Sequence, residues 1–363
     1  MKVVVFNQDV FGGTDRIFEN FLSWSKGRSD VEVYVFRSNE DLLDVDFIIL
    51  PTSEMQAVWK KRKLIPNDCR INVWAMGQDA IHSAFYNTKY RTLYNFMFIG
   101  MFKLFKFFSR KKKIFSFTDE VAYNYFYGNK KVCNEKFIYP IPINGHLEGK
   151  VRNNKSKRFY WLGRLDRDFK IWSLLELLQR LSFIDFDFDF SFHIIGDGDG
   201  KDLLNNSYDF DVIFHGSLSH SKMEEHLKEN ADLLFAMGTS GLEGAKLSIP
   251  TIIVSPLKEG QINSTYRWIY QSKGLSMGEF NDINVKPRQI SMNLHEAIRE
   301  LVKNPERVSK KSYHYSLRFN RDIVFSDLMR DANKYDFFCD AKNTFFLHYL
   351  TVKIKSYVKK IIN

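Results

Sequence analysis

The chain has 363 residues, more than one domain usually contains, so two domains are the natural expectation. Lysine and arginine (53) outnumber aspartate and glutamate (43), and the formal charge of +10 favours an anionic partner such as a phosphorylated substrate or an acidic lipid surface. The three cysteines lie far apart without a Cys-x-x-Cys pair, which argues against a disulfide framework and a zinc cluster. The sequence shows no secretion signal and no apolar stretch long enough to cross a bilayer, so a cytoplasmic location is expected.

The first part of the chain alternates between apolar runs and helical patterns. Residues 2–6 are predicted to be a buried strand, and Gly12 and Gly13 then lead into apolar residues at helical spacing. Because the G-x-G-x-x-G pattern is missing at this turn, a nicotinamide dinucleotide site is not expected. Further strands are predicted at residues 31–36, 47–50, 71–76, 113–118 and 137–143. This order predicts a Rossmann-like domain over residues 1–150.

Residues 90–113 interrupt this order with a dense run of large apolar side chains. Lys103, Lys106 and Arg110 recur within it at helical spacing, and residues 110–113 are all basic. A membrane-spanning helix tolerates such charges poorly, whereas a helix in the membrane interface places them on lipid headgroups. We therefore expect a membrane-associating segment here. An ordinary core helix with a solvated polar face is the alternative.

A polar linker is predicted at residues 145–157, followed by a second α/β domain over residues 157–317. The run GDGDG at residues 196–200 is similar to a calcium-binding loop. However, Lys201 stands where a side-chain oxygen is needed and a late glutamate is lacking, so a tight turn is expected. The elements predicted around it are strands at 158–162, 186–195 and 211–215 and helices at 171–181 and 223–227.

Residues 233–254 have the pattern of a strand, a turn, a short helix and a second strand of a parallel sheet. Gly238 allows close backbone approach at the turn, and Thr239 and Ser240 supply hydroxyl donors. Together with the free amides of a helix N-terminus, these groups favour a bound anion such as phosphate. Ser240 and Glu243 also have the spacing of a capping box, in which both side chains satisfy helix-end amides. The sequence leaves both interpretations open.

The last part of the chain, residues 318–363, is predicted to consist of helices that end in a basic amphipathic tail. One helix is expected at 293–302, ending near Pro305, and another at 318–335. The tail from residue 345 mixes apolar side chains with lysines. It could lie on a membrane, pack on the first domain or fray.

Five short motifs of the second half follow one another in a distinctive order. They are GRL at 163–165 with Lys170, IIGDG at 194–198, VIFHG at 212–216, ADL at 231–233, and Leu242-Glu243 before Pro250. Together they resemble the donor domain of GT-B glycosyltransferases, most closely the family 4 (group 1) enzymes of bacterial polysaccharide synthesis. The resemblance covers about residues 158–255. It implies an α/β fold with two Rossmann-like domains facing a cleft.

The resemblance also implies roles for individual residues in binding a nucleotide diphosphate-sugar. Arg164 and Lys170 match the basic pair that holds the diphosphate, so that no metal ion is needed to neutralise the leaving group. Glu243 matches the glutamate that accepts hydrogen bonds from the ribose hydroxyls, and Thr239 and Ser240 would donate to phosphate. The more ordinary alternative is that the two cations are surface charges.

Two further parts of the donor site follow from the same resemblance. His215 and Gly216 stand where a loop contacts the base, although His215 could equally be an ordinary loop histidine. The family's E-x7-E pair is incomplete, because Phe235 occupies the position eight residues before Glu243. This departure weakens the inference of a retaining mechanism, which is the habit of the family.

On the acceptor side, Gly12 and Gly13 resemble the glycine loop that faces the cleft. Asp79 and His82 follow a predicted strand in the place where acceptor contacts are usual, and either could act as general base toward the acceptor hydroxyl. A helix cap or a packed side chain is the alternative for both.

The sequence as a whole predicts a metal-independent hexosyltransferase without a cofactor. It would move a sugar from a nucleotide diphosphate-sugar to a lipid-linked glycan acceptor in cell-surface polysaccharide synthesis, of O-antigen or capsule, at the inner face of the cytoplasmic membrane. The alternatives are a nucleotide-sugar epimerase of the same fold and a non-catalytic basic scaffold that binds membrane or nucleic acid. Since the aromatic residues follow strand and helix periods, core packing explains most of them and no nucleic acid partner is expected.

Overall fold

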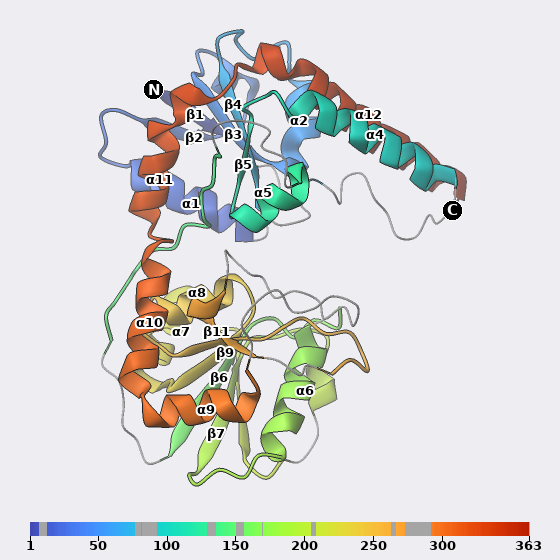
Figure 1. Ribbon diagram of the computed structural model, residues 1–363. Helices are drawn as coiled ribbons and strands as arrows, with labels where there is room; N and C mark the ends of the chain where they lie inside the picture. The colour runs from blue at the N-terminus through green and yellow to red at the C-terminus, as the bar shows by residue number, and fades with distance from the viewer. Residues whose placement is uncertain are drawn as a thin grey trace. The chain divides into compact units, whose positions relative to one another are not determined.

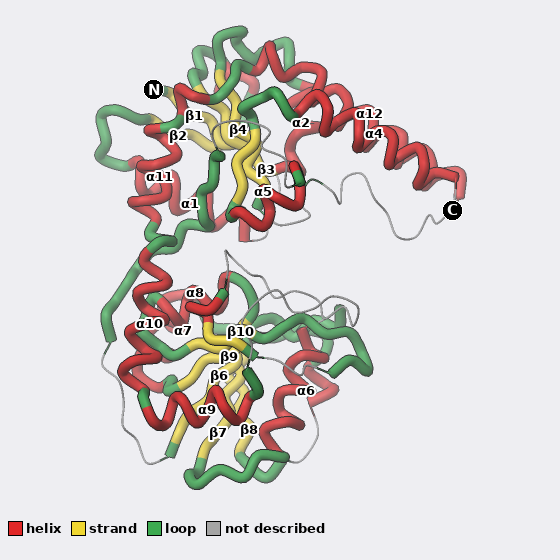
Figure 2. The backbone as a smooth tube through the Cα atoms, in the orientation of Figure 1, coloured by secondary structure: helices red, strands yellow, loops and turns green. Residues whose placement is uncertain are grey.

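The computed structural model describes residues 1–6, 13–76, 81, 93–128, 136–149, 156–168, 170–204, 208–262, 266–272 and 292–362. The chain divides into two compact units, one made of Met1–Pro142 with Arg321–Asn363 and the other of Ile143–Asn320. Each unit contains a parallel sheet with helices packed on its faces (Figure 1, Figure 2). The predicted α/β class with two Rossmann-like domains is therefore confirmed.

The sheet of the first unit has five parallel strands in the order β2-β1-β3-β4-β5. The strands are β1 (Lys2–Val5), β2 (Glu32–Val35), β3 (Phe47–Pro51), β4 (Arg70–Ala75) and β5 (Phe115–Phe117). The apolar runs of β1, β3 and β4 are buried on both faces, as in a parallel sheet that is covered by helices on each side. The strands lie close to the positions that the sequence predicted.

Helices from both ends of the chain cover this sheet (Figure 1). On one face α1 (Gly13–Ser25) meets α11 (Arg321–Arg330), where the rings of Phe21 and Phe325 lie 4.6 Å apart. The core on the other face includes side chains from α2 (Met55–Lys60), α4 (Leu93–Ser109), α5 (Glu120–Tyr127) and α12 (Phe338–Ile362). The C-terminal segment is therefore an integral part of the first unit.

One sequence prediction about local structure was wrong, and one helix was not predicted. Residues 137–143 form only isolated bridges, such as Phe117 with Ile138, because Pro140 and Pro142 lack the N–H groups that a strand needs. A helix was also missed after residue 304. Pro305 opens α10, since proline suits the first turn of a helix as well as the end of the preceding one.

The sheet of the second unit has six strands in the order β11-β10-β9-β6-β7-β8. They are β6 (Lys157–Leu162), β7 (Phe190–Ile195), β8 (Asp211–Gly216), β9 (Leu233–Ala236), β10 (Thr251–Ile253) and the antiparallel β11 (Arg267–Trp268). The chain runs outward in one direction from β6 through β7 to β8. It then returns to the middle and runs in the other direction from β9, so the order of strands reverses between β6 and β9.

Alternating side chains of β6 point to two separate cores. Phe159 and Trp161 belong to the core that also contains residues of α6 (Lys170–Ser182) and α9 (Leu294–Lys303). Tyr160 belongs to the opposite core, which includes residues of α7 (His220–Asn230) and the segment that follows α8 (Thr239–Ala245). The unit also contains α10 (Pro305–Leu317), which contacts α8 and α9.

Five short 3-10 helices complete the described structure. They are η1 (Asn39–Leu42), η2 (Thr52–Glu54), η3 (Lys201–Leu204), η4 (Ile269–Gln271) and η5 (Ala332–Lys334). Among the helices that the structure describes, none is both long enough and apolar enough to cross a membrane.

Candidate functional site

The candidate site lies at the carboxyl edge of the second sheet, where the strand order reverses. Leu162 at the end of β6 pairs with Ala236 at the end of β9, so the loop that follows β6 and the turn that follows β9 leave the sheet side by side. Open α/β sheets bind ligands at such a switch point, because the chain departs to opposite faces of the sheet and leaves a crevice. Arg164 and Gly238 therefore stand at neighbouring places on this edge.

The backbone of the glycine run at residues 196–200 is hydrogen-bonded to the loop that carries Arg164. Leu165 N donates to Asp197 O over 3.0 Å, and Gly200 N donates to Leu165 O over 2.8 Å. A Cβ atom on Gly196 would lie only 1.9 Å from the carbonyl oxygen of Gly163. The predicted tight turn therefore holds the Arg164 loop in place through backbone contacts, and the close approach at position 196 is possible only with glycine.

The two predicted diphosphate-binding cations lie within electrostatic reach of each other. The Arg164 side chain is 75% exposed, and its Nε lies 3.6 Å from Oδ2 of Asp166. Lys170 opens α6, and its pKa is lowered by burial and by the charge of Arg164, while Asp166 acts in the opposite direction. One carboxylate thus faces two cations, and the surplus positive charge favours an anion. Asp166 was not among the residues predicted from the sequence.

The turn after β9 differs from the capping-box interpretation. Gly238 is the N-cap of α8 and has φ 59° and ψ −132°, a conformation that is accessible to glycine and strained for other residues. Within the described residues of this turn, no side chain caps the helix, so the capping-box interpretation of Ser240 and Glu243 is wrong. Because α8 has only seven residues, its dipole adds little to anion binding, and anion binding by Arg164 and Lys170 remains a prediction.

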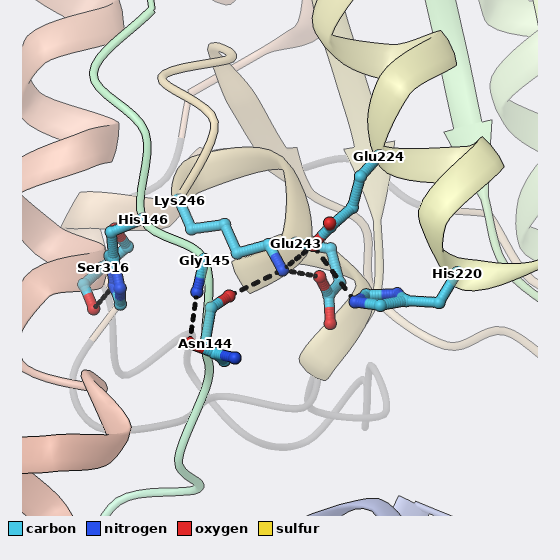
Figure 3. A network of polar contacts seen from close by, with 8 residues as sticks. All are labelled: Asn144, Gly145, His146, His220, Glu224, Glu243, Lys246 and Ser316. Atoms are coloured by element: carbon cyan, nitrogen blue, oxygen red, sulfur yellow. Dashed lines mark hydrogen bonds and ion pairs between the residues drawn. The ribbon is translucent and has the colours of Figure 1, made fainter.

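Glu243 on α8 belongs to a buried charge cluster centred on Lys246 (Figure 3). Lys246 is 1% exposed, and its Nζ lies 2.6 Å from Oε2 of Glu243 and 2.8 Å from the carbonyl oxygen of Asn144. The same nitrogen contacts Oε1 of Glu224 on α7. The ammonium group thus donates hydrogen bonds to Glu224 and Asn144 and forms an ion pair with Glu243. Lys246 and Glu224 were not predicted from the sequence, although the i,i+3 spacing of Glu243 and Lys246 was a usable signal.

His220 extends this cluster and raises the question of a metal ion. Its Nε2 lies 3.1 Å from Oε1 of Glu224, and ligand atoms of His220, Glu224 and Glu243 all lie within 4.8 Å of one another. Lys246 already contacts both carboxylates and supplies the positive charge that a metal would bring. The expected independence of metal remains a prediction.

The segment that enters the second unit is fixed to the same cluster. Besides the contact of Asn144 with Lys246, Leu147 N donates to the carbonyl oxygen of Lys246 over 2.8 Å. His146 lies beside it, with Nε2 3.0 Å from the carbonyl oxygen of Ser316, and burial lowers its pKa (Figure 3). The described part of the predicted linker is therefore bonded along its length to the second unit.

His215, the predicted base contact, stands at the end of β8 in a group of neighbouring imidazole rings. Its Nε2 lies 2.9 Å from Nδ1 of His193, and its ring lies 4.5 Å from that of His226. Burial, together with the nearby charges of His215, Arg158 and His226, lowers the pKa of His193 to about 4. Gly216 has φ 67° and accepts a hydrogen bond from Gly196 N, which ties β8 to the glycine run. A role of His215 in base recognition remains a prediction.

The acceptor-side predictions cannot be placed in the same way. Gly12, Asp79 and His82 lie outside the described residues, and of Gly13 only its position at the start of α1 is described. A surface hollow of about 570 Å³ in the first unit is lined by residues that include Trp59, Arg62 and Lys342. It lies at the amino ends of β3 and β4, which is the edge opposite to the one where ligands of such sheets bind.

No family model matches the sequence, and no curated protein matches it either. Three similar solved structures are TarM of S. aureus, a trehalose-6-phosphate synthase and OtsA, with sequence identities of 13%, 7% and 9% and TM-scores of 0.50, 0.54 and 0.54. They align with 81%, 93% and 91% of this chain and with 56%, 100% and 98% of their own. This chain thus spans about half the length of TarM. At these identities the likeness shows a shared fold, that of GT-B glycosyltransferases.

Proposed function

We propose that the protein is a glycosyltransferase that moves a sugar from a nucleotide diphosphate-sugar to a glycan acceptor. The observation that carries this proposal is that the loop leading from β6 through Arg164 to Lys170 and the turn at Gly238 leave neighbouring strands at the switch point of the second sheet. A nucleoside diphosphate is the ligand that fits this arrangement, because it combines an anionic group with ribose hydroxyls. The fold likeness to a trehalose-6-phosphate synthase supports the same reaction class.

In the proposed reaction the bond between the anomeric carbon and the diphosphate oxygen breaks, and a bond from the acceptor oxygen to that carbon forms. Arg164 and Lys170 would stabilise the charge that develops on the departing diphosphate, so neither a metal nor a cofactor is needed. Glu243 would accept hydrogen bonds from the ribose hydroxyls, with Thr239 and Ser240 near the phosphates. His215 and Gly216 would flank the base. The acceptor proton would pass to Asp79 or His82.

We propose retention as the stereochemical course. The structure of the trehalose-6-phosphate synthase was solved in a study of glycosyl transfer with retention, and its fold is similar to that of this chain. Phe235, which replaces the sugar-side glutamate of family 4, is fully buried in β9. No carboxylate is available from that position, so the sugar contacts must come from elsewhere in the chain.

The proposed acceptor is a lipid-linked glycan of cell-surface polysaccharide synthesis, of O-antigen or capsule, presented at the inner face of the cytoplasmic membrane. The basic, amphipathic character of α4 and α12 supports this acceptor class, since a water-soluble acceptor would not require such a surface.

The test is to incubate the purified protein with a panel of radiolabelled nucleotide sugars and lipid-linked acceptors. Transfer of label by the wild type, and loss of transfer by at least about a hundredfold in Arg164→Ala and Glu243→Ala, is the expected result. Lys222→Ala is a matched control at an exposed position and should transfer normally. Interconversion of a donor without any acceptor would instead indicate the epimerase. Absence of both transfer and donor hydrolysis across the panel would contradict an enzyme of this class.

A further inference from the structure

Helices α4 and α12 pack against each other in antiparallel orientation, and we call this pair the α4–α12 arm. The contacts run in opposite order along the two helices, with Lys355 over the ring of Phe98 and Thr351 Oγ1 3.9 Å from Met101 Sδ. Further along, the ring centroids of His348 and Phe105 lie 6.4 Å apart. Figure 1 shows the two helices side by side, extending beyond the sheet of the first unit. The two segments that the sequence marked as basic and amphipathic thus form one structure.

One line of α4 side chains fills the interior of this arm. Phe98, Phe102, Phe105 and Ser109 are between 0% and 8% exposed and repeat at helical spacing. Lys106 lies over the rings of Phe102 and Phe126, so its methylene chain also covers the interior. Packing against α12 and the rest of the first unit therefore explains why these side chains are buried.

A second line of α4 side chains has no such explanation, because it remains exposed. Met97, Leu104 and Phe107 are 38%, 45% and 65% exposed, and they recur every three to seven residues on the outer side of the helix. We call these three side chains the outer stripe. Apolar side chains that repeat along one exposed helix face indicate a surface that is covered in use.

The charges around the outer stripe are almost all of one sign. Lys103 and Lys111 are exposed next to it, and the sequence of α4 contains no acidic residue. In the 25-residue sequence of α12 the only acidic residue is Asp340, near its first turn, while Lys353 is exposed further along. An acidic surface is the complementary partner for such a face.

We propose that the α4–α12 arm docks on an anionic lipid bilayer, with the outer stripe of α4 inserted among the lipids. Leu104 and Phe107 would lie at the boundary between headgroups and acyl chains, and Lys103 and Lys111 would contact acidic headgroups. A second protein would need its own acidic apolar surface, whereas an anionic bilayer supplies both properties at once. This inference deepens the proposed membrane location, but its test is independent of sugar transfer.

The test uses the full-length protein and vesicles of phosphatidylcholine, with or without phosphatidylglycerol, in a flotation assay. The wild type should float with the phosphatidylglycerol vesicles, and this binding should weaken as the salt concentration rises. With vesicles of phosphatidylcholine alone, the protein should stay at the bottom of the gradient. Leu104→Ser/Phe107→Ser and, separately, Lys103→Glu/Lys111→Glu should each weaken binding by more than about tenfold. In addition, the tryptophan of Leu104→Trp should give a blue-shifted emission only when anionic vesicles are present.

Matched controls keep this test specific. Phe183→Ser removes an 80% exposed aromatic ring from the second unit, and Lys26→Glu/Lys222→Glu reverses two exposed charges outside the arm; both should bind like the wild type. Equal binding to neutral and anionic vesicles would overturn the proposal, as would normal binding by either arm variant. Self-association that depends on Leu104 and Phe107, without any vesicle binding, would show that the stripe is a protein interface instead.

Discussion

At the scale of single residues, Lys246 stands out because its charged side chain is almost completely buried beside the predicted donor site. Its ammonium group is almost closed to water and lies between the carboxylates of Glu224 and Glu243, which are 29% and 12% exposed. Removing the cation would leave two carboxylates facing each other in a poorly solvated place. Breaking a buried ion pair in this way costs about 3–5 kcal/mol.

We therefore predict that Lys246→Met lowers the free energy of unfolding by about 3 kcal/mol, toward the lower end because Glu224 keeps some contact with water. Urea denaturation of the purified protein measures this change. Adding Glu224→Gln to Lys246→Met should restore part of the loss, since one of the repelling charges is removed. Lys222→Met at an exposed site on α7 is the control. An unchanged urea midpoint for Lys246→Met would mean that the lysine does not hold the carboxylates together.

Two buried histidines predict a dependence of stability on pH. Burial lowers the pKa of His193 to about 4, helped by His215, Arg158 and His226, and burial with the charge of Lys355 does the same to His348. Because the folded form then binds fewer protons than the unfolded chain, stability should fall as pH drops from about 6.5 to about 4. Each histidine accounts for up to about 3 kcal/mol over this range.

Urea midpoints measured between pH 7 and pH 4 test this prediction. His348→Leu should flatten the part of the pH dependence that belongs to the first unit, since it removes the proton-binding group. His314→Leu, which changes an exposed histidine, should leave the pH dependence as it is. A wild-type midpoint that stays constant down to pH 4 would contradict the prediction.

At the scale of elements, the glycine run 196–200 determines the position of the loop that carries Arg164. An alanine at position 196 would combine a positive φ of 148° with a Cβ 1.9 Å from a backbone oxygen, so the loop would have to move. We predict that Gly196→Ala lowers the free energy of unfolding by more than about 3 kcal/mol and weakens nucleotide binding.

Gly216 provides the matched control for this variant. It also has a positive φ, of 67°, but an added Cβ would meet nothing within 4 Å. Gly216→Ala should therefore cost only about 1–2 kcal/mol, the strain of the left-handed conformation alone. Thermal unfolding of both variants compares them directly. Equal losses would show that backbone strain, and not the contact with Gly163, is the reason for glycine at position 196.

Local patterns in the sequence predicted most of the elements, because apolar runs and glycine turns depend on neighbours in the chain. The strands of both sheets except β11, and the turn at Gly238, were found in this way. The error at residues 137–143 arose because an apolar run outweighed Pro140 and Pro142. The helix that opens at Pro305 was missed because proline can either end or begin a helix, and only packing decides between the two.

The candidate site was predictable in part for a similar reason. Arg164, Lys170 and Glu243 lie in short motifs that resemble a known family. Glu224 and His220 reach the same cluster from α7, and Asn144 reaches it from the connecting segment, so only the folded chain brings them together. Glu224 and Lys246 are 22 residues apart and Asn144 and Lys246 are 102 apart, and contacts at such separations leave no periodic signal in the sequence.

At the scale of the whole molecule, the first unit is built from two separate stretches of chain, whereas the second unit is continuous. The continuous unit contains the whole predicted donor site. We predict that a fragment of residues 143–320 folds cooperatively by itself. Truncation after Asn320 should unfold the first unit, because it removes α11 and α12 from both faces of the sheet.

Circular dichroism melts and limited proteolysis of the two truncated proteins check this division. Protease resistance should remain in residues 143–320 and disappear from residues 1–142. A fragment 143–320 that melts without cooperativity would argue that the second unit depends on the first.

The proposed function requires Arg164 and Lys170 to bind the diphosphate of a nucleotide at the edge of the second sheet. Titration calorimetry of the full-length protein with UDP, ADP and GDP measures this most directly. We predict saturable binding of at least one of them, weakened about a hundredfold or more in Arg164→Ala/Lys170→Ala and unchanged in Lys26→Ala/Lys222→Ala. Equal affinity in both double variants, or no binding of any of the three diphosphates, would contradict the claim.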